Sequence, residues 1–592
     1  MEISDYALLA DCHGAALVAR DGAIEWCCMP RFDDGALFAR VLDPDGGACT
    51  IEVEGGGLSD RRYLQDTLVL ESTLRGGGGE ARLLDAMPFE DPLDPAREHR
   101  ALLRIVEGVR GTVTVRFRVA ARFDYGEVRP WLRHQGRGVY AAIGGDDGLL
   151  CACDPGFEPD DGDLVAEAMV REGERVRVLI AFRRPDELER HHGPPGAERL
   201  DAALEDTVRR WREWAKDTRE DVRRSAIVLK ALTYEPTGAM VAAATTSLPE
   251  TLQGGERRTW DYRYSWIRDA VLATHCLTEL GHDDEADAFR RFVERSAAGT
   301  AADLRVFYGI GGERRLNEQE LPLKGWHGAR PVRVGNAAAD QLQLDAYGHL
   351  LQQSWNWFEL GHSPDDDYWR FLLDLVDAAA ERWQEPDCGI WEWRGAPRHF
   401  VHSKAMCWVA LDRGIALAER SLRRAPLRRW KAARDEVRDA VLSKGYDAGR
   451  GTFVQAFGSG DLDAAVLRLP AYGFIACDDE RMVSTVGVLR EALGEDGLLR
   501  RYDADDGMPR EGAFIPCTFW LAQVLAGQGR AEEAQETFDR ALQTATDLGL
   551  FSEEADAATG EALGNFPQAF THLSHIEAAL SLHADGGRWS SP

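Results

Sequence analysis

Hydrophobic and polar residues alternate through the first third of the chain, which predicts β-strands with one buried face. The alternation is strict at 113–119 and again at 176–182. Residues 16–26 read as a hairpin around an Asp-Gly dipeptide at 21–22, which tolerates positive φ at both turn positions. Because no segment with helical period interrupts these strands, residues 1–195 are expected to form an antiparallel β-sandwich domain.

The period of the apolar positions changes after a Pro/Gly break at 193–196. Residues 196–220 are expected to form a helical linker, and the apolar positions from 221 to 592 recur every three to four residues. At ordinary helix and loop lengths, this region has room for about twelve helices. A closed double ring of helices would use such a length, and so would a solenoid, so periodicity leaves both open.

Charge and cysteine usage exclude several classes of protein. The chain carries 100 acidic and 70 basic residues, for a net charge of −30. Nucleic acids and anionic membranes are bound through Lys and Arg, so neither is an expected partner. No apolar stretch reaches the roughly 18 residues of a membrane helix, and the first residues lack the features of a secretory signal. Eleven cysteines without a C-x-x-C pair argue against structural zinc and favour a reducing cytoplasm.

Two segments are rich in residues that could bind or cleave a sugar. Arg268 and Asp269 are adjacent at a predicted loop-to-helix junction, where they could hydrogen-bond the hydroxyls of one ring; a structural salt bridge is the alternative. Glu392 lies between Trp391 and Trp393. Desolvation there would raise the pKa of the carboxyl, as a general acid requires, whereas an exposed turn would leave it unchanged.

A third segment, 559–568, carries Glu561 just before a Gly- and Pro-containing turn. A helix-capping or solvated Glu is the simpler interpretation. However, Glu392 and Glu561 could meet across a ring of helices, and glycoside hydrolysis needs such a pair of carboxyl groups. Glu511 is a rival for the second role, and Lys404 follows Glu392 closely enough to line the same cleft.

Several motifs in the same order resemble glycoside hydrolase family 15, the glucoamylase family with its bacterial and archaeal glucoamylase-like and trehalase members. The matching segments span nearly the whole chain and lie at 3–8, 21–33, 232–250 and 330–336. The resemblance implies an (α/α)6 barrel over 221–592 as the catalytic domain, preceded by a β-sandwich.

The resemblance also implies roles for individual residues. Glu392 matches the general acid and Glu561 the general base, and no metal or cofactor is needed. Other matching or neighbouring positions are expected to bind substrate: Tyr262, Trp266, Arg268, Asp269, Trp326, Arg330, Trp391 and Lys404. Of these, Tyr262 matches a residue near the nucleophilic water. Ala562 departs from the fungal members, which place Gln beside the base.

The expected function is an inverting, exo-acting hydrolase that releases β-glucose from the non-reducing end of short α-glucans. A trehalase with the same two carboxyl groups is the alternative, because the sequence does not resolve the site for the second sugar. A non-catalytic carbohydrate-binding protein and a phosphorylase are further possibilities, against which the presence of both Glu392 and Glu561 argues. The sequence does not indicate an oligomeric state.

Overall fold

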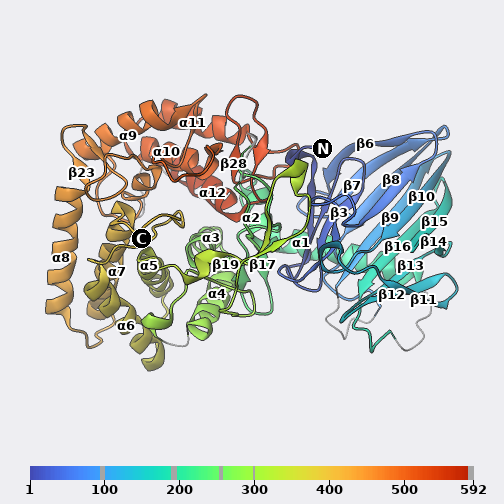
Figure 1. Cartoon of the computed structure of the whole chain (residues 1–592), viewed down its shortest axis with the longest axis horizontal. Coiled ribbons are helices and arrows are strands. Elements are labelled where there is room, and N and C mark those ends of the chain that lie inside the picture. Colours follow the sequence, from blue (N-terminus) through green and yellow to red (C-terminus); the bar gives the residue numbers. More distant parts are fainter. Residues whose placement is uncertain (94–99, 189–195, 252–257, 298–299, 584–592) are drawn as a thin grey trace. The chain divides into compact units, whose positions relative to one another are not determined.

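The computed structural model describes residues 1–93, 100–188, 196–251, 258–297 and 300–583, so most of the break at 193–196 lies outside the described residues. These residues form two compact units (Figure 1). The first unit comprises residues 1–236 together with 322–332 and 546–550. The second comprises 237–321, 333–545 and the chain from 551 onward.

The first unit contains the antiparallel β-sandwich that the alternating pattern predicts. Each of its two sheets has eight strands. The first sheet consists of β1 (Ala7–Ala10), β2 (Ala15–Val18), β3 (Ile24–Cys28), β4 (Ala36–Ala39), β5 (Ala48–Val53), β10 (Thr112–Ala120), β14 (Glu158–Asp160) and β15 (Asp163–Arg171). The second consists of β6 (Gly57–Tyr63), β7 (Leu70–Gly76), β8 (Gly79–Ala86), β9 (Ala101–Arg110), β11 (Trp131–Gly136), β12 (Val139–Gly144), β13 (Asp147–Cys153) and β16 (Arg175–Phe182).

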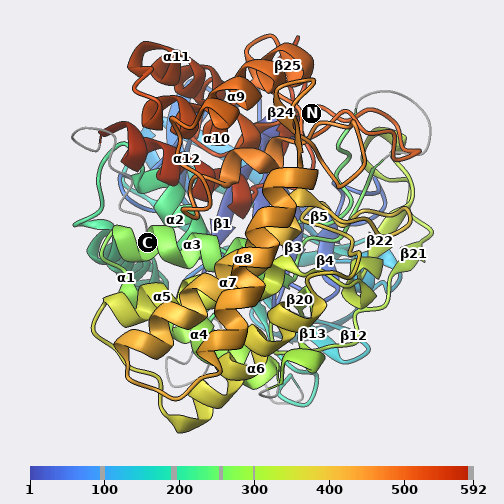
Figure 2. The same cartoon turned by 90° about the vertical axis from the view of Figure 1, so that its left-hand side faces the viewer.

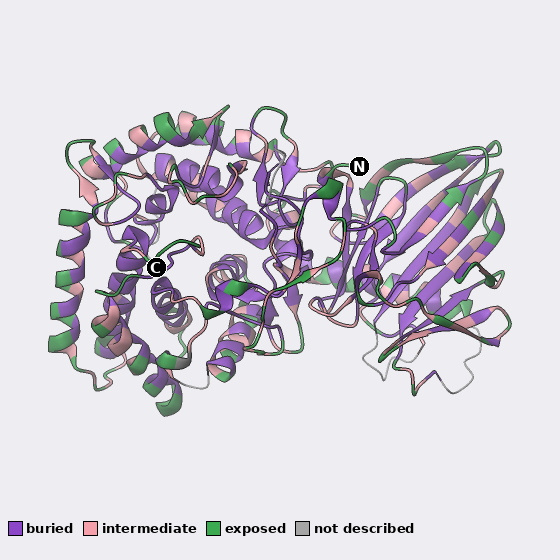
Figure 3. Cartoon of the chain, in the orientation of Figure 1, coloured by how far each residue is buried: buried purple, intermediate pink, exposed green. Residues whose placement is uncertain are grey.

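Burial follows the predicted alternation along β10 but not along β16, where Val178 to Phe182 are all buried. On β10, Val113, Val115, Phe117 and Val119 are buried while the intervening residues are more exposed, and Figure 3 shows the same alternation across the sheets. The predicted hairpin is also confirmed, since β2 and β3 pair in antiparallel register.

Two helices follow the sandwich within the first unit, namely α1 (Ala197–Ala215) and α2 (Arg223–Ala231). The expected linker is therefore helical over most of its length. Leu200 and Leu204 of α1 pack into the cluster formed by Leu103, Ile105 and Leu179 of the sandwich. This helix is thus part of the packed core of its unit.

The second unit is a double layer of helices (Figures 1 and 2). Its inner segments are α3 (Ile267–Glu279), α5 (Asp345–Glu359), α7 (Val401–Arg420), η6 (Ala464–Arg468), α10 (Ile515–Gly527) and α12 (Ala569–His583). Each contacts the next in this order, and α12 contacts α3, so the ring closes. The outer helices are α4 (Asp283–Ser296), α6 (Asp366–Arg382), α8 (Leu427–Lys444), α9 (Glu480–Leu493) and α11 (Ala531–Leu542). The closed ring of six inner segments is that of an (α/α)6 barrel, with five outer helices in this unit, and it excludes the solenoid.

Loops between these helices carry short strands and 3₁₀ turns. The strands are β17 (Thr233–Tyr234), β18 (Ala239–Met240), β19 (Ser265–Trp266), β20 (Phe307–Tyr308), β21 (Gln319–Leu321), β22 (Val332–Val334), β23 (Tyr446–Asp447), β24 (Thr452–Phe453), β25 (Gly494–Glu495), β26 (Leu498–Leu499), β27 (Ala513–Phe514), β28 (Glu554–Ala555) and β29 (Ala562–Leu563). The remaining 3₁₀ turns of the chain are η1 (Ile3–Asp5), η2 (Asp124–Gly126), η3 (Ala301–Asp303), η4 (Trp326–Gly328) and η5 (Ala337–Asp340). Among the described helices, none has the length and apolar character needed to cross a membrane.

Candidate active site

The start of α3 brings together three of the predicted sugar-binding residues. Trp266 ends the short strand β19, and its ring stacks on Phe307 of β20 with centroids 4.3 Å apart. Arg268 and Asp269 follow in the first turn of the helix, where the Arg268 Nε donates to Asp269 Oδ1 at 2.6 Å. The ion pair that was the alternative interpretation is therefore present, and both residues also line a cavity.

Glu392 is held in this cluster by three donors. Trp266 Nε1, Arg268 Nη1 and Gln343 Nε2 lie 3.2, 3.2 and 3.3 Å from its Oε1. Its backbone adopts φ 51°, a left-handed conformation that is unusual for a residue other than Gly. Burial raises the pKa of the Glu392 carboxyl, and the nearby Arg268 guanidinium opposes this shift. The environment therefore favours a protonated carboxyl more than solvent does.

Two cavities meet at Glu392. The smaller, of about 300 Å³, is lined by Arg268, Asp269, Glu553 and Gln568, among others. The larger, of about 490 Å³, has walls that include Trp260, Arg394 and Asp506. Five residues line both: Tyr262, Trp266, Trp391, Glu392 and Arg501. An acid at this junction is placed to act on a bond that joins one sugar in each cavity.

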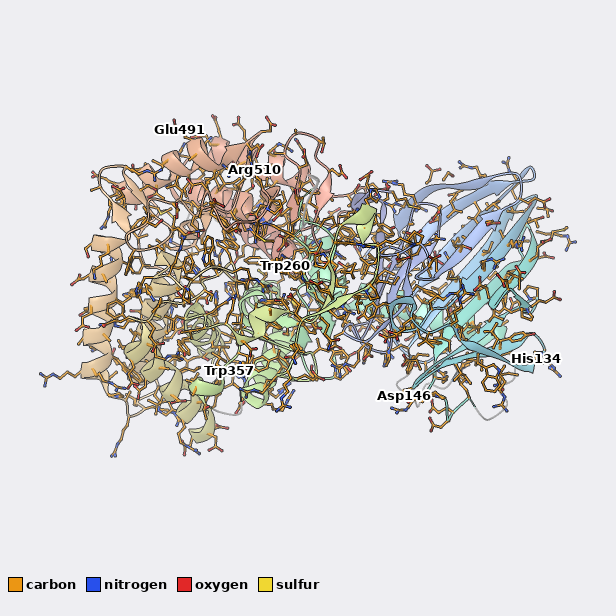
Figure 4. The ribbon with its side chains drawn as sticks, in the orientation of Figure 1. His134, Asp146, Trp260, Trp357, Glu491 and Arg510 are labelled. Carbon is orange, nitrogen blue, oxygen red and sulfur yellow. The ribbon has the colours of Figure 1, made fainter. Side chains whose placement is uncertain are left out.

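Aromatic and cationic side chains form much of the wall of the larger cavity. Trp260, which Figure 4 labels in the helical unit, lies beneath two guanidinium groups. Those of Arg394 and Arg333 are 4.3 and 4.7 Å from its ring centroid. Arg394 also donates to Asn336 Oδ1 at 3.1 Å. The wall thus combines flat apolar surface with fixed donors, a pattern suited to a hydroxylated ring.

Glu553 is the second carboxyl group in the smaller cavity, and the sequence interpretation missed it. It precedes β28, is only 4% exposed, and its Oε1 accepts a hydrogen bond from Gln568 Nε2 at 3.1 Å. Burial raises its pKa well above the usual range, and the neighbouring Glu250 adds to the shift. A useful signal was available: two consecutive Glu residues at 553–554 follow the apolar residues Leu550 and Phe551 after a single Ser.

Glu561, the predicted base, lies elsewhere on the same hairpin. β28 and β29 pair through Glu554 with Leu563 and Ala555 with Ala562, so Glu561 sits in the turn at the far end. It is partly exposed and lines neither cavity. The structure therefore brings Glu553, and not Glu561, into the cavity with Glu392.

Three of the other predicted binding residues line neither cavity. Lys404 is fully buried on α7, and its ammonium group donates to the carbonyl of Glu385. Trp326 and Arg330 belong to the first unit, where Trp326 packs against Tyr6. Tyr262 and Trp391, by contrast, line both cavities as expected.

A buried group of three carboxyl groups surrounds Arg501, which lines both cavities. One carboxylate oxygen from each of Glu250, Glu511 and Glu554 lies within 4.8 Å of the others. Among the described residues, this is the one group of three or more acidic, His or Cys side chains that brings its ligand atoms so close together. Arg501 Nη2 lies 3.6 Å from Glu250 and 3.5 Å from Glu554, and Arg258 Nη1 lies 2.9 Å from Glu511. The two guanidinium groups supply the positive charge that these carboxylates need.

Comparison with known proteins identifies the family. The sequence model of "Glycosyl hydrolases family 15" matches residues 216–580, which is more than half of the chain. The chain belongs to glycoside hydrolase family 15. It is therefore a glycoside hydrolase, as the motifs predict. A second model, "Trehalase-like, N-terminal", matches residues 1–206.

Relatives of this family 15 chain match it over nearly its full length. Trehalase from Mycolicibacterium smegmatis is 38% identical, with 98% of this chain and 91% of the relative covered. Trehalase from Thermoplasma acidophilum is 34% identical, with 96% and 98% covered. Among solved structures, a bacterial glucoamylase complexed with acarbose superposes with a TM-score of 0.73 and 13% identity, covering 98% of this chain and 94% of that one. That similarity supports the fold of both units.

Proposed function

We propose that this family 15 hydrolase cleaves α,α-trehalose into two molecules of glucose. The observation that carries the reaction is the position of Glu392 at the junction of two cavities, with Glu553 in the smaller one. The choice of substrate rests on the relatives named trehalase, which match the chain from end to end. Hydrolysis of short α-glucans, the function first expected, would use the same two carboxyl groups.

The proposed reaction is a single displacement with inversion. Protonated Glu392 donates its proton to the glycosidic oxygen, while ionised Glu553 takes a proton from a water that attacks the anomeric carbon from the opposite face. The bond from that carbon to the glycosidic oxygen breaks as the bond to water forms. The sugar in the smaller cavity leaves as β-glucose, and the other leaves as α-glucose.

Binding in the smaller cavity prepares this step. Arg268 and Asp269 present charged hydrogen-bonding groups to the hydroxyls of the ring, and the indole of Trp266 covers part of the wall. Their ion pair fixes both side chains before substrate arrives, so less entropy is lost on binding. Positioning of this kind converts binding energy into rate.

A substrate panel with product analysis tests the proposal. Purified enzyme is incubated with trehalose, maltose, maltotriose, isomaltose and dextran, and glucose anomers are followed by proton NMR before mutarotation. We expect trehalose to be the preferred substrate, with α- and β-glucose appearing in equal amounts at early times. Preferred release of β-glucose from maltotriose or dextran would replace trehalase with the α-glucan activity. Release of α-glucose alone would contradict inversion.

A further inference from the structure

Tyr262 directs its hydroxyl proton away from both cavities. Its side chain lines each of them, yet its OH donates to Glu250 Oε1 at 3.1 Å. Glu250 is 1% exposed and lines neither cavity. A phenol has one proton and two lone pairs, so a Tyr262 whose proton is committed to Glu250 can offer only acceptor capacity to the cavity.

Glu250 is fixed firmly enough to hold that orientation. Its backbone N donates to the carbonyl of Arg258 at 3.0 Å, and its own carbonyl accepts from Gly512 N at 3.3 Å. Its Oε2 lies 3.6 Å from Arg501 Nη2. Both ends of the residue are therefore held, and the Arg501 guanidinium compensates its charge.

Glu250 also lies beside the base assigned above. A Cβ placed on Gly564 would come within 3.3 Å of Glu553 Oε2 and 3.7 Å of Glu250 Cγ, so the two side chains approach the same point of the backbone. Gly564 has φ 79°, which favours glycine as well. Glu553 Oε2 has no hydrogen-bond partner among the described residues. The Glu553 side chain lines the smaller cavity together with Tyr262.

We propose that Glu250 is a positioning residue for the attacking water and acts through Tyr262. A water placed between Glu553 and Tyr262 donates one O–H to the carboxylate and the other to the phenol oxygen. One of its lone pairs then points at the anomeric carbon. In the reaction Glu553 receives the first proton and the second stays on the new hydroxyl of glucose, so Tyr262 and Glu250 exchange no proton.

This inference rests on the proposed function, and the variants separate the two. Tyr262→Phe removes the acceptor oxygen, Glu250→Met removes the acceptor for the Tyr262 proton, and Glu250→Gln keeps an amide oxygen that accepts it. The matched control is Glu554→Gln, which alters another carboxyl of the same buried group, one that accepts a hydrogen bond from Gly512 N at 2.9 Å. The substrate is α-glucosyl fluoride, because fluoride leaves without a proton and the water side of the reaction is then measured alone.

We expect Glu250→Met and Tyr262→Phe each to lower kcat by about 10- to 100-fold, the cost of misplacing a reacting group. KM should change little, and the double variant should be no slower than the slower single one. Glu250→Gln and Glu554→Gln should stay within about threefold of wild type. Two results would overturn the inference: an equal loss of kcat in Glu250→Gln and Glu250→Met, or a kcat loss in the double variant Glu250→Met/Tyr262→Phe equal to the product of the two single losses.

The Glu553→Gln variant separates a failure of the base assignment from a failure of the role of Glu250. If Glu553→Gln hydrolyses the fluoride normally, the base assignment fails and the proposed function with it. If Glu553→Gln is inactive while folded Tyr262→Phe keeps full kcat, only the role of Glu250 fails. Tyr262→Phe leaves the buried Glu250 site filled, so it tests the inference even if Glu250→Met does not fold.

Discussion

Burial raises the pKa of two carboxyl groups in this site, and their neighbours then separate their roles. Glu392 receives three hydrogen bonds on one oxygen and is opposed by Arg268, whereas Glu553 faces Glu250 and the Arg501 guanidinium. The pKa values of the neighbouring Glu250 and Glu554 are raised as well, and the Arg501 guanidinium opposes the shift at all three carboxyl groups, which favours the ionised form that a base needs. In the proposed reaction, environment and not residue type distinguishes the acid Glu392 from the base Glu553.

Single substitutions should distinguish the two candidate bases. We expect Glu392→Gln and Glu553→Gln each to lower kcat on trehalose by about 10²–10⁴-fold, as for loss of a general acid or base. Glu561→Gln, a matched change on the same hairpin, should stay within about twofold. Because the pKa of Glu392 is raised, the alkaline fall of activity on trehalose should begin above the ordinary pKa of glutamate, as Glu392 loses its proton. The pH profile with α-glucosyl fluoride should lack this alkaline fall. Loss of activity in Glu561→Gln with normal activity in Glu553→Gln would restore the original assignment.

The sequence predicted the acid side of the site better than the base side, for a physical reason. Trp266, Arg268 and Asp269 are contiguous at a helix start, and Trp391 flanks Glu392, so local pattern already placed them together. The base depends on a hairpin whose register decides which Glu faces inward. Glu553 and Glu561 stand at opposite ends of that hairpin, and no local period distinguishes them.

At the scale of elements, the loops above the helical ring carry the chemistry. Strands with alternating patterns and helices with a 3.6-residue period were predictable because each buries one face. Closure of the ring was not, because it depends on contacts such as those of α12 with α3 and of η6 with α10. The short segment η6 takes an inner place that a long amphipathic helix would otherwise fill, and its length gave no such signal.

The loop that carries Glu392 also supplies Arg394, which we expect to bind the second sugar. Its guanidinium lies on Trp260 and donates to Asn336 in the larger cavity. Arg394→Met should lower kcat/KM for trehalose by about 10- to 100-fold, the value of hydrogen bonds to a charged group. Hydrolysis of α-glucosyl fluoride, which has no second sugar, should stay within about twofold.

Arg398→Met is the control for this loop. Arg398 stacks on Trp393 with its guanidinium carbon 4.4 Å from the ring centroid, but it lines neither cavity. Both substrates should be hydrolysed nearly normally by this variant. Equal losses on trehalose and the fluoride in Arg394→Met would show that Arg394 supports the loop and does not bind the leaving sugar.

At the scale of the whole molecule, the chain divides into two units with separate cores, and the division does not follow the sequence. Residues 322–332 and 546–550 pack with the first unit although helices of the second unit flank them in the chain. Asp547, for example, pairs with Arg61 at 2.7 Å. Sequence pattern predicts continuous domains, because such short returning segments carry no period of their own.

Separate cores predict that one unit can be destabilised selectively. Arg468 of η6 and Glu577 of α12 form a bidentate ion pair within the helical ring, with N–O distances of 2.6 and 3.1 Å and side chains 3% and 9% exposed. Glu577→Gln would leave a buried guanidinium without its counter-charge, at a cost of about 3–5 kcal/mol. Hydrogen exchange measured by mass spectrometry should show faster exchange in α10 and α12, with strands β9 and β10 unchanged.

The double variant Arg468→Met/Glu577→Met decides whether charge is the cause. Two apolar side chains of similar length remove both charges together, so the helical unit should recover much of the stability lost in Glu577→Gln. A double variant as unstable as the single one would assign the loss to packing against Trp520, above which the Arg468 guanidinium lies. Both substitutions lie in the helical ring, and neither residue belongs to the sandwich. Faster exchange in the sandwich strands of either variant would therefore mean that the two units unfold together, which would contradict the prediction.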